Sequence, residues 1–264
     1  MITNNPFSGL SELIAPIAMQ GFAIAMIALV AVGTLIDIIH KKNVKYFFDN
    51  AKKAKKSAKI ELTSTQRTSV ILKTVVHDIA TTAELGRGKR RVAHVLGMYG
   101  TIIFWVTSAL LIFSFPTAGS STPSSLTIMW HVGAIMTCLG GFWFWLFLRV
   151  DVLAEAHPWY RIIKADLFVL ALLACATFGL AWSYTQFSGM TKLSYLFLVL
   201  YITSNLVLFG GVYWSKFAHM FYKPGAAIQK NLAEADGSRD NLPPLADAPK
   251  QFGLGIKREQ PKHY

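Results

Sequence analysis

Five long runs of hydrophobic residues divide the chain, and each is about the length needed to cross a lipid bilayer as a helix. None of them contains Asp, Glu, Lys or Arg, and Asp37 lies just beyond the first run. The runs cover residues 13–36, 92–115, 126–148, 167–187 and 193–215. This pattern predicts an all-α integral membrane protein whose five helices form a transmembrane bundle.

The distribution of positive charge predicts how the bundle is oriented. The chain is 53% hydrophobic and 15% charged, with a net charge of +12. Residues 40–91 carry 14 Lys and Arg and residues 215–264 carry 8, whereas residues 1–39 and 116–125 carry none. Because Lys and Arg accumulate in cytoplasmic loops, we expect the N-terminus outside and the C-terminus in the cytoplasm of a bacterial or archaeal inner membrane. This location also argues against a nucleic-acid partner.

The first two regions are a span and a basic loop. Residues 1–40 are expected to hold a true first span, started or bent at Pro16, because no basic residue precedes it as in a signal peptide. Residues 41–91 form a cytoplasmic loop whose lysines and aromatic residues suit acidic lipid headgroups. Its second part, residues 69–84, has the hydrophobic spacing of an amphipathic helix that lies on the membrane or against a soluble partner.

The remaining chain is a bundle followed by a tail. Residues 92–223 hold the other four spans, and Pro224 with Gly225 is expected to end the last helix. Residues 224–264 are rich in proline and carry charges of both signs, which predicts a largely disordered cytoplasmic tail.

Two histidines lie at matching depths in this topology. His94 follows Arg91 by three residues as span 2 begins, and His219 follows Lys216 by three residues as span 5 ends. Haem b needs two axial imidazoles in an apolar site, with cations near its propionates. His94 and His219 would supply the imidazoles, and the cations would be Arg90, Arg91 and Lys216. Gly97 and Gly100 could leave room for the macrocycle, although both histidines could equally be interfacial residues that face headgroups.

Other polar residues are weaker candidates. His131 opens span 3 from the outer side, where a quinone contact and a simple interfacial role both fit. Asp151, His157 and Arg161 lie in the inner loop, where ionisable groups could serve quinone protonation, although ordinary loop roles also fit. Cys138 and Cys175 lack the spacing of a metal site and read as small buried residues.

The segments KTVVHDIATTAELGRGKRRVAHVLGMYGT and WSKFAHMFYKP carry a family resemblance. With the five-span pattern, they resemble the cytochrome b (gamma) subunit of respiratory nitrate reductase. They are more similar still to the membrane subunit of heterodisulfide reductase and the C subunit of the quinone-interacting oxidoreductase. A stand-alone chain of this length looks most like the membrane anchor of adenylylsulfate reductase.

The resemblance covers about residues 10–225. It implies haem b on His94 and His219, exchange of electrons with membrane quinone, and a cytoplasmic flavin and iron–sulfur oxidoreductase on the inner face. The nitrate reductase subunit has a second, outer haem, but Phe104 and Tyr201 stand near its expected ligand positions here. One haem is therefore preferred over two.

Two other interpretations remain open. The chain could be a haem-free anchor that only tethers a soluble reductase, or a small transporter or scaffold. Against transport, no span has a buried charge or a paired helix break.

Overall fold

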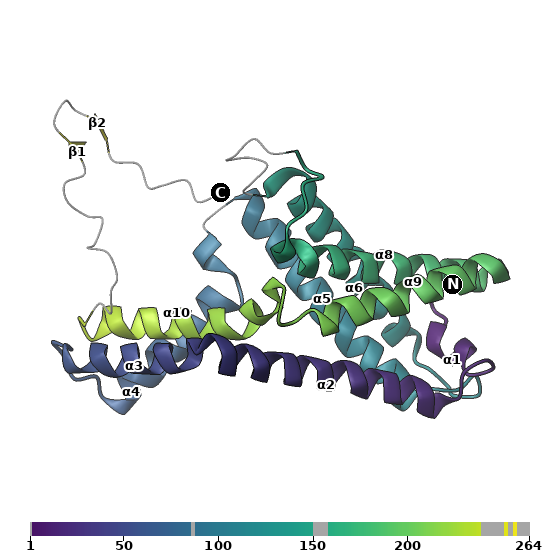
Figure 1. Ribbon diagram of the computed structural model, residues 1–264, viewed down its shortest axis with the longest axis horizontal. Coiled ribbons are helices and arrows are strands. Elements are labelled where there is room, and N and C mark those ends of the chain that lie inside the picture. The colour runs from purple at the N-terminus through teal and green to yellow at the C-terminus, as the bar shows by residue number, and fades with distance from the viewer. Residues whose placement is uncertain (1, 86–87, 150–157, 239–250, 253–255, 258–264) are drawn as a thin grey trace. The chain divides into compact units, whose positions relative to one another are not determined.

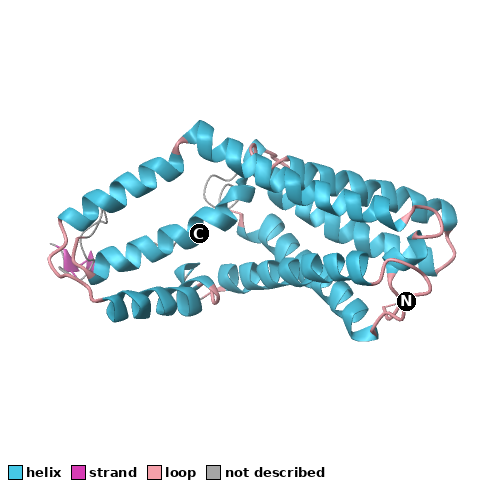
Figure 2. Ribbon diagram, turned by 90° about the horizontal axis from the view of Figure 1, so that it is seen from below, coloured by secondary structure: helices cyan, strands magenta, loops and turns pink. Residues whose placement is uncertain are grey.

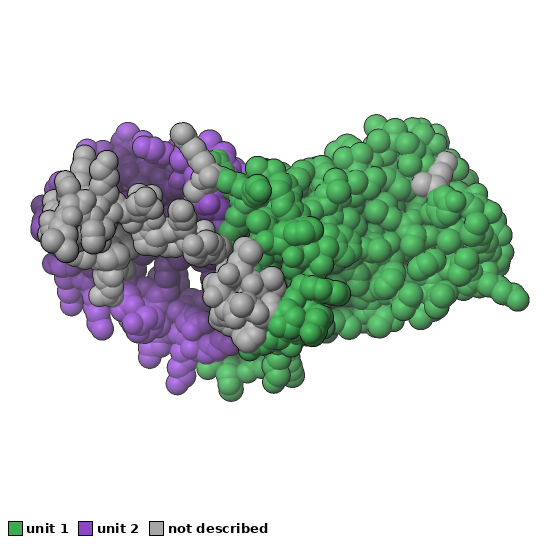
Figure 3. All heavy atoms as spheres, turned by 90° about the horizontal axis from the view of Figure 1, so that it is seen from above, with its two compact units in different colours: residues 1–40, 88–218 green, residues 41–87, 219–264 purple. Residues whose placement is uncertain are grey.

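The computed structural model describes residues 2–85, 88–149, 158–238, 251–252 and 256–257. Most of this chain is helical (Figure 2), and the strands within it are β1 (Gln251–Phe252) and β2 (Ile256–Lys257). The chain separates into two compact units (Figure 3). Unit 1 comprises residues 1–40 and 88–218, and unit 2 comprises residues 41–87 and 219–264.

Five helices in the described chain are long and apolar enough to cross a membrane, which confirms the predicted fold class of a multi-pass α-helical membrane protein. Helix α6 continues without a break into a π-helical turn, η3 (Phe144–Leu148). The five helices are α2 (Pro16–Lys41), α5 (Lys89–Ser114), α6 (Ser124–Trp143), α8 (Leu167–Phe187) and α9 (Thr191–Gly210).

Within unit 1, helices α5, α6, α8 and α9 pack into a bundle in which sequence neighbours lie side by side (Figure 1). Small and hydroxyl residues face the interior of the bundle, as is usual where membrane helices approach closely. Helix α2 begins at Pro16, as the sequence suggests, and Gly33 on it lies against the side chain of Val212.

The short helix α1 (Pro6–Leu10) was not predicted from the sequence. The Asn5 side chain accepts a hydrogen bond from the Phe7 amide at 3.0 Å, and its own amide donates to the Phe115 carbonyl at 2.9 Å. These bonds hold α1 at the C-terminal end of α5. Phe7 is buried there, between the rings of Trp130 and Trp182.

Unit 2 contains α3 (Asn43–Lys56), α4 (Ser64–Lys73), the π-helical η1 (Thr74–Ile79), the short η2 (Ala83–Leu85) and α10 (His219–Ala235). A capping box of Thr63 and Gln66 starts α4. Helix α10 packs against α3, α4 and η1. The predicted amphipathic helix of residues 69–84 is thus present in part, and it packs on another helix of its own chain.

The expected helix end at Pro224 is wrong, because Pro224 lies inside α10. The last span ends earlier, at Gly210. The next residue is Gly211, and a Cβ at this position would lie only 2.5 Å from the Val207 carbonyl oxygen. Proline removes one helical hydrogen bond, and burial of Ala227, Leu232 and Ala233 offsets that loss. The predicted tail therefore begins with a packed helix, and most of the rest of it lies outside the described residues.

Candidate functional site

The N-terminal end of α5 carries the first of the two predicted haem ligands. Arg90 and Arg91 occupy its first turn and are half-buried, and His94 follows one turn later with its side chain exposed. Gly97 lies a further turn along the same face, and a Cβ at this position would meet no atom within 4 Å. This face of α5 can therefore be reached by a flat ligand.

The opposite side of α5 is closed by α6. A Cβ at Gly100 would lie 2.6 Å from the Thr137 amide nitrogen, and one at Gly140 would lie 2.4 Å from the Gly97 nitrogen. The expectation that Gly100 leaves room for a macrocycle is thus wrong, because the α6 backbone fills that space. Only Gly97 of the predicted pair faces open space.

The second predicted ligand does not belong to the helix of span 5. Helix α9 ends at Gly210, a 3₁₀ turn η5 covers Lys216–Ala218, and His219 is the first residue of α10. The helix ends at Gly210, with Gly211 as its C-cap. The sequence stays apolar beyond this point, so hydropathy does not reveal the helix end. Lys216 is exposed and His219 is half-buried.

Phe217 fixes η5 within unit 1. Its ring stacks on Trp105 at 6.0 Å between centroids and meets Phe168 edge-on at 5.4 Å, and Phe209 completes the cluster. His219 follows two residues later, but it belongs to unit 2 whereas His94 belongs to unit 1. The pairing of the two imidazoles stays a prediction.

Aromatic side chains of α5, α6, α8 and α9 fill part of the bundle interior. Phe104 and Trp130 have ring centroids 5.2 Å apart, and Trp182 stacks on Tyr201 at 5.8 Å. All four are buried. The level at which a second haem would lie is therefore occupied by the protein's own rings.

His131 lies beside this cluster as a buried core residue with both ring nitrogens in hydrogen bonds. Nδ1 donates to the Thr127 carbonyl at 2.8 Å, which fixes the tautomer because a carbonyl can only accept. Nε2 lies 2.8 Å from the Ser183 hydroxyl on α8. The ring thus links α6 to α8, and no nitrogen is left for a metal.

The loop between α6 and α8 contains the weaker quinone candidates. Asp151 and His157 lie outside the described residues, and the Arg161 side chain is exposed. The sequence analysis missed the residue that organises this loop, Arg149, which is buried and paired with Asp166. Opposite charges at the end of one span and the start of the next are the signal that could have revealed the pair.

In unit 2, a polar contact joins α10 to η1. The Asn231 side-chain amide donates to the Thr74 hydroxyl at 2.9 Å and to the Asp78 carboxylate at 2.6 Å. A hydrogen bond from the His77 ring holds the pKa of Asp78 below its usual range, Asn231 adds to this effect, and burial opposes it. Thr74 is buried at this contact, so polar as well as apolar residues fix α10.

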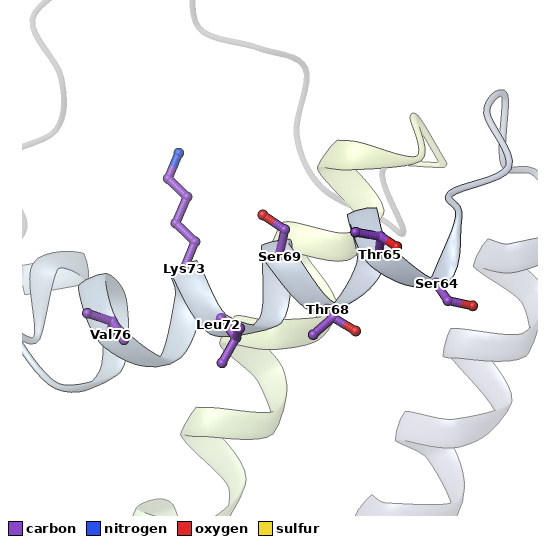
Figure 4. Close-up of a pocket in the computed structure, with 7 residues that line it drawn as sticks. All are labelled: Ser64, Thr65, Thr68, Ser69, Leu72, Lys73 and Val76. Carbon is purple, nitrogen blue, oxygen red and sulfur yellow. The ribbon is translucent and has the colours of Figure 1, made fainter.

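The other side of α4 is open to solvent. A shallow depression there is lined by residues of α4 and η1 alone, in two rows at helical spacing, and Lys73 extends away from the helix (Figure 4). The lining residues are Ser64, Thr65, Thr68, Ser69, Leu72, Lys73 and Val76. This surface has no enclosing wall, so it does not form a small-molecule site.

In the part of the chain that the structure describes, no group of three or more His, Cys, Asp or Glu side chains could hold a metal ion. Haem with two axial ligands does not require such a group. Comparison of the chain with family models, with curated proteins and with solved structures found no match.

Proposed function

We propose that the chain is a membrane anchor and electron-transfer subunit that carries haem b and exchanges electrons with membrane quinone. The observation that carries the proposal is the contrast between two histidines of the bundle. His94 is exposed on a membrane-spanning helix one turn before Gly97, where a Cβ would meet no atom within 4 Å, whereas His131 is buried in the core. Ionisable groups in spans are rare and generally functional.

In this proposal His94 and His219 would hold the iron through one imidazole nitrogen each. Arg90, Arg91 and Lys216 bind the propionates, since guanidinium and ammonium groups pair well with carboxylates. The bound haem would supply one-electron transfer between the partner enzyme and quinone. The aromatic packing around Phe104 favours one haem over two.

The partner would be a cytoplasmic flavin and iron–sulfur oxidoreductase, with adenylylsulfate reductase favoured by the resemblance. Lysines of α3 offer a basic surface for it, since Lys45, Lys52 and Lys56 are exposed in one row at helical spacing. Arg161, Asp151 and His157 remain candidates for quinone contacts, because proton transfer needs ionisable groups beside the headgroup.

Reduced-minus-oxidised absorption of the purified full chain tests the haem. We expect a haem b band in the unaltered protein, and its loss in both His94→Ala and His219→Ala. His40→Ala is the matched control, because His40 is an exposed histidine that contacts the Tyr213 ring. If the band survives both substitutions, these two imidazoles are not the ligands.

A second pair of variants separates ligation from the shape of the site. Gly97→Leu would fill the open face beside His94 and is expected to lower haem content. Gly21→Leu is the control, because a Cβ there also meets no atom within 4 Å but lies on α2. Equal haem content in the two variants would contradict a macrocycle beside Gly97.

A haem-free anchor is the second candidate, because α10 packs with α3, α4 and η1 into a compact unit that carries the exposed lysines of α3. It predicts no absorption band, together with co-purification of a flavin and iron–sulfur enzyme in mild detergent. Loss of that enzyme on replacing Lys45, Lys52 and Lys56 by glutamine would support it.

A further inference from the structure

Arg149 is 3% exposed at the end of span 3, directly after η3. Its guanidinium carbon lies 4.1 Å from the centre of the Trp145 ring, a cation–π contact. The same group pairs with the Asp166 carboxylate. A buried charge must be paired and hydrogen-bonded to be tolerated, and both conditions are met.

The remaining donors of Arg149 bind the backbone of the inner loop. One nitrogen donates to the Arg161 carbonyl at 2.7 Å and lies 3.5 Å from the Trp159 carbonyl. The Asp166 carboxylate in turn accepts from the Ile163 amide at 2.9 Å. The ion pair therefore holds the backbone of residues 158–166 from the inside and fixes its conformation.

With its backbone held inward, the loop presents its large side chains outward. Tyr160 is 66% exposed and Ile162 is 64% exposed, and Trp159 lies edge-on to Tyr160 at 5.8 Å. Arg161 and Lys164 are exposed between and beside them. Exposure of apolar side chains of this size to water is unfavourable, and such a surface beside cations generally marks an interaction site.

We propose that residues 158–164 form an interfacial anchor that binds anionic lipid headgroups, and that Arg149 is its positioning residue. The segment lies directly before the span that begins at Lys164, in the connection from the span that ends at Leu148, which places it near the membrane surface. Trp and Tyr concentrate at that depth, and anionic headgroups attract Arg and Lys. Trp159, Tyr160 and Ile162 enter the acyl boundary, while Arg161 and Lys164 meet phosphates. This proposal stands independently of haem.

Spin-label depth measurements on the reconstituted full chain test the anchor. A nitroxide is placed at Tyr160→Cys, in a chain whose Cys138 and Cys175 are replaced by alanine. In phosphatidylcholine vesicles with phosphatidylglycerol, we expect the label to meet oxygen more readily than a water-soluble nickel complex. A label at Ala118→Cys, in the exposed outer turn, is the control and should meet the nickel complex.

Further variants separate lipid binding from structure. Arg161→Gln with Lys164→Gln should abolish the extra immersion that phosphatidylglycerol gives, lowering the preference for anionic lipid about fivefold per cation removed. Arg149→Lys keeps the charge but not the forked geometry, so the label at 160 should become more mobile and shallower while the label at 118 is unchanged. A label at 160 that meets the nickel complex in both lipid mixtures overturns the proposal, and points to a protein partner instead.

Discussion

At the scale of single residues, glycines determine how closely α5 and α6 approach. A Cβ at Gly140 would lie 2.4 Å from the Gly97 nitrogen and 2.5 Å from the Ala93 carbonyl, and one at Gly133 would lie 2.7 Å from the Phe104 nitrogen. Backbone atoms cannot rotate away as side chains can, so any side chain here must move a helix. The glycines thus have distinct roles, since Gly97 itself faces open space.

We therefore expect Gly140→Ala to destabilise the bundle by about 1–3 kcal/mol, the usual cost of overpacking. The measurement is the thermal midpoint in mild detergent, compared with Gly21→Ala. A Cβ at Gly21 meets no atom within 4 Å, so that variant should be neutral or slightly stabilising. Equal midpoints for both variants would show that α5 and α6 do not pack through Gly140.

His131 leads to a second prediction at this scale. Its ring joins Thr127 on its own helix to Ser183 on α8. His131→Ala should lower the free energy of unfolding by about 1–3 kcal/mol, because it leaves a buried hydroxyl without this bond. In the His131→Ala background, Ser183→Ala should lower the free energy of unfolding by less than it does in the unaltered protein, as a double-mutant cycle would measure. Additive costs would mean that the two side chains do not interact.

At the scale of elements, the spans were predictable and their ends were not. About 20 apolar residues without charge define a span whatever surrounds it, so four runs agree with helices to within a few residues. The fifth run continues through Val212 to Trp214, and hydropathy alone cannot register the break at Gly210–Gly211. Helix α1 was missed because five residues carry too little pattern.

The candidate site was predictable only as far as local spacing reaches. The position of His94 one turn past Arg91 follows from the sequence, and so does its place at the start of a span. The Nε2 atom of His131 is hydrogen-bonded to Ser183, 52 residues away, and the space beside Gly100 is filled by α6. Such contacts arise from packing between helices, which no local pattern encodes.

The contact of α10 with η1 carries a prediction on pH. Because its folded pKa is lowered, the Asp78 carboxylate stabilises the contact fully above its unfolded value of about 3.9. That contribution is lost as the pH falls through the folded value. We expect the hydrogen-exchange protection of α10, corrected for intrinsic rate, to fall as the pH drops below about 4.

Asn231→Ala and Asp78→Asn test this assignment separately. The first should lower α10 protection at pH 7 by about fivefold, the equivalent of about 1 kcal/mol for a partly exposed bond. The second should remove this pH dependence, since no carboxylate remains to titrate. Peptides from α8 should keep their protection in both variants. A pH dependence that persists in Asp78→Asn would assign it to another group.

At the scale of the whole molecule, charge and span count together determine which side each connection occupies. Five crossings place successive connections on alternating sides of the membrane. The connection of residues 40–91 carries 14 Lys and Arg, and residues 116–125 carry none. This difference predicts a cytoplasmic location for the first connection and an external one for the second.

Cysteine labelling in intact cells measures this orientation. Ala118→Cys should react with a membrane-impermeant maleimide in intact cells, and Lys53→Cys only after permeabilisation. The parent chain is the control for Cys138 and Cys175, which lie within spans. The reverse pattern would put α3, Arg90 and Arg91 outside the cell. A cytoplasmic enzyme could then not dock on the basic surface of α3, so this result would exclude the proposed partner whether or not haem is bound.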